Sequence, residues 1–205
     1  MTRFTLTRAA ALALCALAVS GCSLLSSPDP VQTYRFGGGS GPVVEAGPNS
    51  SLRQVALRMV EMPEAAEGDR ILGVTGTETA WIKGARWVSR AQDLYMDSLE
   101  NAFAAQSTRV RLIGPREQTP GQRTLNIDIR AFEARYSAPG SAPTVVITAR
   151  ARMLALPDRA VAAERTFTVE QPATANRVGA IVEAFDVATR DLNTEIVAWT
   201  DANAG

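Results

Sequence analysis

Three consecutive segments between residues 125 and 169 place apolar side chains at every second position, and this pattern constrains the fold more than any other feature. The apolar positions are Leu125, Ile127 and Ile129 in the first segment, Val145, Ile147, Ala149, Ala151 and Met153 in the second, and Val161, Ala163, Phe167 and Val169 in the third. Alternation with a period of two predicts strands that bury one face. Pro157-Asp158-Arg159 predicts a tight turn between the last two. The pattern therefore predicts an antiparallel meander that is covered on one side only.

Two amphipathic helices are predicted to supply the cover. The last helix has an apolar stripe formed by Val178, Ile181, Val182, Phe185, Ala188, Leu192, Ile196 and Trp199. The other helix follows Ser89, which has capping-box spacing to Gln92, and extends to about residue 107. Shorter strands are expected at 52–62, where Pro63 ends the pattern, and at 70–75, 79–83 and 109–113. The prediction is a two-layer α+β fold: a mainly antiparallel β-sheet with two amphipathic helices packed on one face.

The N-terminal segment has the layout of a secretory signal peptide. Arg3 and Arg8 precede an apolar run over residues 9–19, and Val19-Ser20-Gly21-Cys22 follows. The run is too short to span a bilayer, which takes about 20 apolar residues. Val-Ser-Gly-Cys resembles a bacterial lipobox, in which the cysteine is lipidated and becomes the new N-terminus. We therefore expect residues 1–21 to be a lipoprotein signal peptide and Cys22 to carry a thioether-linked diacylglycerol; the alternative is an ordinary secreted protein with a chance cysteine after the cut.

Residues 22–50 have the composition of a flexible tether, and residues 51–205 are expected to form a single folded domain. Serines and prolines at 26–30 and the run Gly37-Gly38-Gly39-Ser40-Gly41-Pro42 are typical of linkers. The glycine run lacks the Gly-Lys-Ser/Thr of a phosphate-binding loop. Between these stretches, residues 33–36 alternate and predict a short strand.

The composition argues against several classes of function. The chain contains no histidine, and Cys22 is the only cysteine that remains after residues 1–21 are removed. A Ser-His-Asp arrangement and the usual zinc sites are therefore excluded, and we expect no metal, no cofactor and no enzymatic activity. After Arg3 and Arg8 are lost, 19 basic and 21 acidic residues give a formal charge of −2. A near-neutral domain is not a general nucleic-acid binder.

The order of elements adds a family resemblance. A lipobox is followed by Tyr34-Arg35-Phe36, a strand ending in Val60-Glu61-Met62-Pro63, Arg86-Trp87 before a helix, and Leu125-Asn126-Ile127-Asp128-Ile129-Arg130-Ala131-Phe132 before two strands and a final helix. Over nearly the whole mature chain this resembles the ABC-type transport auxiliary lipoproteins, which include the paraquat-inducible protein C-like lipoproteins. Two departures are Glu64-Ala65-Ala66, where the family often has Tyr-Leu, and Phe36, where it often has leucine.

The resemblance implies a non-enzymatic accessory subunit in the bacterial cell envelope. Such lipoproteins face the periplasm and are thought to dock an MCE-domain protein at a membrane, as part of an ABC system that moves lipids between membranes. In such lipoproteins, an aspartate directly after the lipidated cysteine is associated with retention in the inner membrane. This chain has Ser23 at that position, so by analogy the outer membrane is favoured. A lipid carrier that itself encloses acyl chains is the alternative, and an envelope hydrolase is a third hypothesis that the missing histidine disfavours.

Two groups of residues are candidates for partner contact. Arg130, Arg150 and Arg152 fall on the polar strand face and would suit lipid phosphates, an acidic partner or a second copy of the chain. The simpler interpretation is a solvated sheet face, paired with acidic neighbours. Trp81 and Trp87 are the other candidates, because tryptophan is enriched at interfaces; alternatively they cap the sheet or the first helix.

Overall fold

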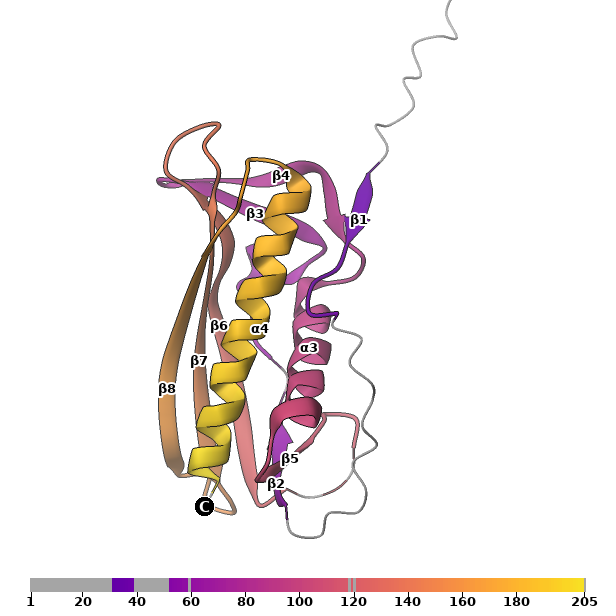
Figure 1. Cartoon of the computed structure of the whole chain (residues 1–205). Helices are drawn as coiled ribbons and strands as arrows, with labels where there is room; N and C mark the ends of the chain where they lie inside the picture. Colours follow the sequence, from indigo (N-terminus) through magenta and orange to yellow (C-terminus); the bar gives the residue numbers. More distant parts are fainter. Residues whose placement is uncertain (1–30, 39–51, 59, 118, 120, 205) are drawn as a thin grey trace, which may run out of the picture. The chain divides into compact units, whose positions relative to one another are not determined.

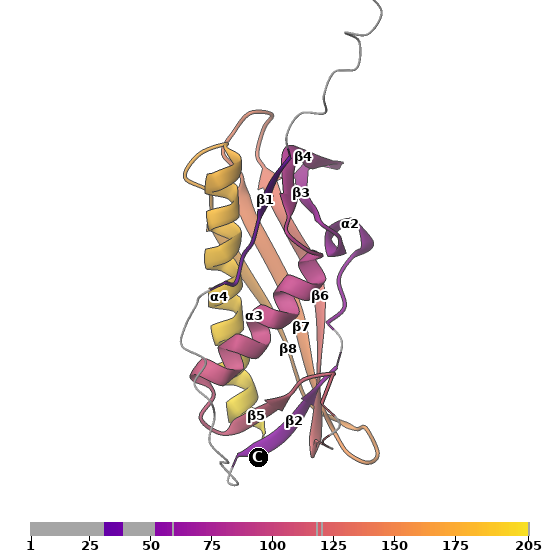
Figure 2. The same cartoon turned by 90° about the vertical axis from the view of Figure 1, so that its right-hand side faces the viewer.

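The computed structural model describes residues 31–38, 52–58, 60–117, 119 and 121–204. Within that range, eight strands form one sheet, accompanied by three helices (Figures 1 and 2). The strands are β1 (Gln32–Tyr34), β2 (Arg53–Leu57), β3 (Arg70–Thr75), β4 (Glu78–Trp87), β5 (Val110–Ile113), β6 (Arg123–Tyr136), β7 (Thr144–Ala155) and β8 (Val161–Pro172); the helices are α2 (Glu64–Glu67), α3 (Ala91–Gln106) and α4 (Val178–Asn203). The predicted α+β class is confirmed.

Strands β6, β7 and β8 form the predicted antiparallel meander. Ile127 lies opposite Ala151, Ala149 lies opposite Phe167, and all four side chains are buried. Val161, which was expected on the buried face, is instead 58% exposed. It is the first residue of a strand at the edge of the sheet, and a register shift separates it from the regular part of the ladder.

The middle of β6 contains a bulge that the alternating pattern did not predict. The pairing with β7 shifts between Ile129 and Ala131, so Arg130 is an extra residue in β6. Before the bulge the buried apolar positions of β6 are odd-numbered, as at Ile129, and after it they include Phe132 and Ala134. The bulge therefore keeps the apolar side of the whole strand on the core.

The other edge of β6 pairs with two separate groups of strands, and these pairs are parallel. β2 lies beside the start of β6 and also pairs with β5, whereas β3 lies beside the end of β6 and continues through β4 to β1. The sheet is therefore mixed, although its longest ladders, β6 with β7 and β7 with β8, are antiparallel.

Helices α3 and α4 cover one face of the sheet, as predicted (Figure 2). Their buried side chains include Tyr95, Leu99 and Phe103 of α3 and Phe185 and Leu192 of α4. The capping box predicted at Ser89 and Gln92 is wrong, because Arg90 is the N-cap and makes no side-chain cap bond. The side chain of Gln92 instead donates to the backbone oxygen of Val60, a buried acceptor from a distant segment.

The packed chain begins before residue 51, because β1 and the residues after it join the core. β1 pairs with β4, and Phe36 is 2% exposed. The Phe36 ring centroid lies 4.8 Å from that of Trp87 in an edge-to-face arrangement and 5.1 Å from that of Phe132. Val31–Gly205 accordingly forms one compact unit. The predicted lipidation site Cys22 and the remaining tether positions, 23–30 and 39–50, lie outside the described residues.

The strand expected at 52–62 is shorter than predicted. β2 ends at Leu57, and Glu61 makes only an isolated bridge with Asp128 of β6. Pro63 is then the N-cap of α2. In the part of the chain that the structure describes, no helix is long and apolar enough to cross a bilayer.

Candidate functional site

The meander face opposite to α3 and α4 carries polar side chains in cross-strand rows. Asn126, Arg152 and Glu164 lie in register in one row, and Asp128 and Arg150 lie in the next. These positions alternate with the buried ones, because successive side chains of a strand point to opposite faces. The structure therefore brings the three predicted arginines onto one surface, which we call the arginine face: Arg130, Arg150 and Arg152.

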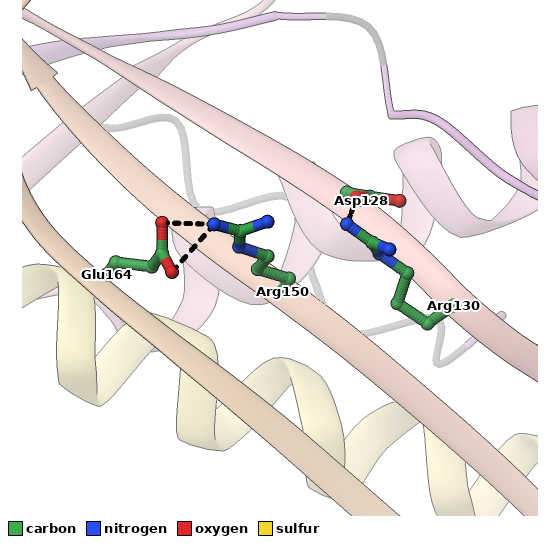
Figure 3. Close-up of polar contacts among 4 residues, drawn as sticks. All are labelled: Asp128, Arg130, Arg150 and Glu164. Atoms are coloured by element: carbon green, nitrogen blue, oxygen red, sulfur yellow. Dashed lines mark hydrogen bonds and ion pairs between the residues drawn. The ribbon is translucent and has the colours of Figure 1, made fainter.

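Arg150 and Glu164 form the best-defined ion pair on this face (Figure 3). Nη2 of Arg150 donates to both carboxylate oxygens of Glu164, each at 2.8 Å, across β7 and β8. This hydrogen bond lowers the pKa of Glu164 and raises the pKa of Arg150 from their ordinary values. Arg130 and Arg152 add to the lowering at Glu164 through their charge.

Arg130 pairs within its own strand. Its Nη2 lies 2.5 Å from Oδ2 of Asp128, and the Arg130 side chain is 54% exposed (Figure 3). Its place in the bulge explains this contact, because a bulge re-aims the side chain of the extra residue. Both ion pairs of the arginine face are thus partly open to water. Exposed ion pairs add little to stability, so an incoming acidic group can replace either carboxylate at small cost.

Arg152 is the arginine of this face that keeps its donors available. Among the described residues, its guanidinium makes no hydrogen bond and no ion pair within 4 Å. It lines a hollow of about 170 Å³ together with Arg58, Glu61, Asn126, Ile127 and Asp128. The side-chain oxygen of Asn126 is buried there without a hydrogen-bond partner in the described structure. Because both charge signs and an unpaired amide oxygen line the hollow, it suits a polar side chain of a partner better than an apolar one.

The two tryptophans that were predicted to contact a partner differ in exposure. Trp87 is 2% exposed and packs against Phe36, Phe132 and Phe185, so it belongs to the core. The prediction that Trp87 contacts a partner is therefore wrong. Its apolar neighbours come from the segment after β1, from β6 and from α4, and no local pattern in the sequence indicates them. Trp81 is 53% exposed and lies 4.2 Å under the guanidinium of Arg70, so it remains available.

The site has the chemistry of a binding surface. In the described part of the chain, no three His, Cys, Asp or Glu side chains are grouped so that they could hold a metal ion. The functional groups on the arginine face are guanidinium, carboxylate and hydroxyl groups that face solvent, and their natural role is to form ion pairs and hydrogen bonds. The sequence did not indicate Arg58 as part of this surface, because its position depends on the parallel pairing of β2 with β6.

Comparisons with known proteins agree with this architecture. A family model described as ABC-type transport auxiliary lipoprotein component matches residues 38–197. The crystal structure of protein XCC0632 from Xanthomonas campestris superposes with a TM-score of 0.67 at 27% identity, covering 85% of this chain and 94% of that chain. A crystal structure of an uncharacterized protein has a TM-score of 0.60 at 16% identity, covers 72% of this chain and 91% of that chain, and shows a shared fold. No curated protein sequence matches the chain.

Proposed function

The chain belongs to the family of ABC-type transport auxiliary lipoprotein components, and from this premise we propose that it docks an MCE-domain protein of a lipid-transporting ABC system at a membrane. In this proposal the protein is not an enzyme. It is held in the cell envelope by lipid on Cys22 and faces the periplasm, and Ser23 after the cysteine favours the outer membrane by analogy. The single observation that carries the docking role is the arginine face, which α3 and α4 leave uncovered in a family of transport accessory subunits.

The physical case for docking is that the arginine face offers charge without requiring much rearrangement. Arg130 and Arg150 are held by partly exposed carboxylates that a partner can replace, and Arg152 is already available. Arginine binds carboxylates and phosphates through a planar fork of donors, so a partner with acidic side chains fits this surface. The paired strands also hold the backbone of Arg130, Arg150 and Arg152 at fixed spacing, so binding need not order the main chain.

The alternative of a lipid carrier needs an apolar cavity between the sheet and the helices. The described structure fills this layer with fully buried side chains, among them Tyr95, Leu99, Ile127, Met153 and Phe185. Close packing of this kind favours the docking role over the carrier role. A delipidated sample that released no bound phospholipid on extraction would agree with docking.

The experiment is a charge reversal on the arginine face. Arg150→Glu with Arg152→Glu in the lipidated protein should weaken crosslinking to the MCE-domain subunit at least tenfold, which corresponds to about 1.4 kcal/mol. The matched control is Arg53→Glu with Arg109→Glu, which changes the charge equally at two exposed arginines of β2 and the turn before β5. This control should bind like the wild type.

Three results would oppose the proposal. Equal crosslinking of both double variants would remove the arginine face from the docking site. Equal loss in both would indicate a nonspecific charge effect. Recovery of unrelated envelope proteins in place of an MCE-domain subunit, with wild-type protein, would contradict the docking role itself.

A further inference from the structure

We propose that one end of the domain rests on the bilayer surface, with Trp81 and Tyr136 at the level of the lipid headgroups. This is the end at which β1, the first strand after Cys22, begins. This inference depends on the lipidation of Cys22 in the proposed function, but not on the identity of the protein partner. We call this region the β1 end: the start of β1, the β3–β4 hairpin, and the connections 137–143 and 173–177. In both views the β1 end is opposite to the C-terminus (Figures 1 and 2).

Chain length limits which end of the domain can meet the membrane. β1 begins at Gln32, and nine residue steps separate Val31 from Cys22. Nine steps reach at most about 30 Å even when fully extended. α4 starts at the β1 end and has 26 residues, which at 1.5 Å per residue gives about 39 Å to the far end. The stretch from Cys22 to Val31 is therefore shorter than the domain, and the far end is out of its reach.

The connections at the two ends differ in charge. At the β1 end, the turn Gly76-Thr77, the loop 137–143 and residues 173–177 contain one charged side chain, that of Arg177 directly before α4. At the far end, the connections contain Arg109, Arg116, Glu117, Asp158 and Arg159. Loops with few charges lose little hydration when they approach a bilayer, whereas buried charges are costly to desolvate. The β1 end is thus the one suited to contact with lipid.

The β1 end also carries the side chains that prefer a lipid interface. A hollow of about 330 Å³ is lined by Gly73, Thr75, Glu78, Ala80, Trp81, Ile82, Lys83 and Tyr136. Tryptophan and tyrosine concentrate at membrane interfaces, where one part of each ring is apolar and the other is wet, and lysine extends its ammonium group to the headgroups. Val31, directly before β1, is 49% exposed and adds a further apolar contact.

The test measures depth in the membrane with the full lipidated protein. An environment-sensitive dye is attached through Thr77→Cys in the β3–β4 turn, which keeps Trp81 in place, or through Ala202→Cys near the end of α4. Once Cys22 carries lipid, each substitution supplies the sole thiol of the mature chain. Vesicles of phosphatidylethanolamine and phosphatidylglycerol contain headgroup-proximal spin-labelled lipid. We expect quenching of the dye at position 77 to be several-fold stronger than at position 202. Trp81→Ser should reduce the quenching at position 77.

Each other outcome is informative. Equal quenching at positions 77 and 202, or stronger quenching at 202, would overturn the inference and leave the docking proposal standing. Unchanged quenching at position 77 with Trp81→Ser would remove Trp81 from the contact. Failure of the wild-type protein to float with vesicles would overturn this inference and the lipid-anchored part of the proposed function together.

Discussion

Replacing Phe36 with alanine tests whether the segment after β1 belongs to the folded domain. Phe36 is 2% exposed and is placed edge-to-face against Trp87, so the substitution removes a buried ring and leaves a cavity. Phe-to-Ala changes in cores typically cost about 3–5 kcal/mol of unfolding free energy. β1 pairs through three residues, at the edge of the sheet, and can release without the rest unfolding. We therefore expect a loss near the lower limit, about 3 kcal/mol.

The assay is urea unfolding of a soluble form that starts at Ser23. With a slope of about 2 kcal/mol per molar urea, a loss of this size lowers the unfolding midpoint by about 1.5 M. Val31→Ala is the matched control, since Val31 is 49% exposed, and its effect should stay within about 0.5 kcal/mol. Hydrogen exchange at residues 31–38 should also accelerate in Phe36→Ala. A loss below about 1 kcal/mol, with unchanged exchange, would refute the placement of Phe36 in the core.

Two further predictions concern buried and exposed polar pairs. Ser98→Ala removes the acceptor of the buried hydrogen bond that Nδ2 of Asn193 donates over 2.9 Å, and should lower the unfolding free energy by about 1–3 kcal/mol in the same urea assay. Adding Asn193→Leu should restore most of this stability, because the unpaired amide is then gone. A loss that persists in the double variant would show that the unpaired amide is not its cause. The hydrogen bond from Arg150 lowers the pKa of Glu164 below 4.5, so the pair stabilises the folded state above about pH 4.5, and this contribution is lost as pH falls through the lowered pKa. Arg150→Gln should return the pKa of Glu164 toward 4.5 in a carboxyl-resolved NMR titration, and an unchanged value would assign the shift to another neighbour.

The sequence predicts best where the structure depends on neighbours in the chain. The meander and α4 follow from periodic patterns and short connections, and the alternation alone places Arg150 and Arg152 on one face. The bulge at Arg130 also leaves a trace, because the apolar positions change parity between Ile129 and Phe132. These features are visible because side-chain direction is a local property of a strand.

Pairing between distant segments leaves no such trace. β2 has five residues and pairs in parallel with both β5 and β6, so nothing near it in sequence indicates its partners. Gln92 has the spacing of a capping residue, yet the buried oxygen of Val60 competes for its amide. Phe36 ends a short predicted strand between two linker-like stretches, and the rings that bury it come from other elements. In each case a tertiary contact overrides the local preference, and sequence patterns cannot reveal such a contact.

The positions of the two proposed surfaces restrict how a partner can approach. β6, β7 and β8 run between the β1 end and the far end, so the arginine face lies along the side of the domain (Figure 1). If the β1 end rests on the bilayer, these strands stand roughly along the membrane normal, and Arg150 and Arg152 point parallel to the membrane. A docked protein would then stand beside this domain at the membrane surface. Phe36 affects the β1 end alone, because release of β1 would increase the number of residues between Cys22 and the first paired strand from nine to thirty. Phe36→Ala in the lipidated protein should therefore weaken quenching at position 77 while leaving the arginine face intact.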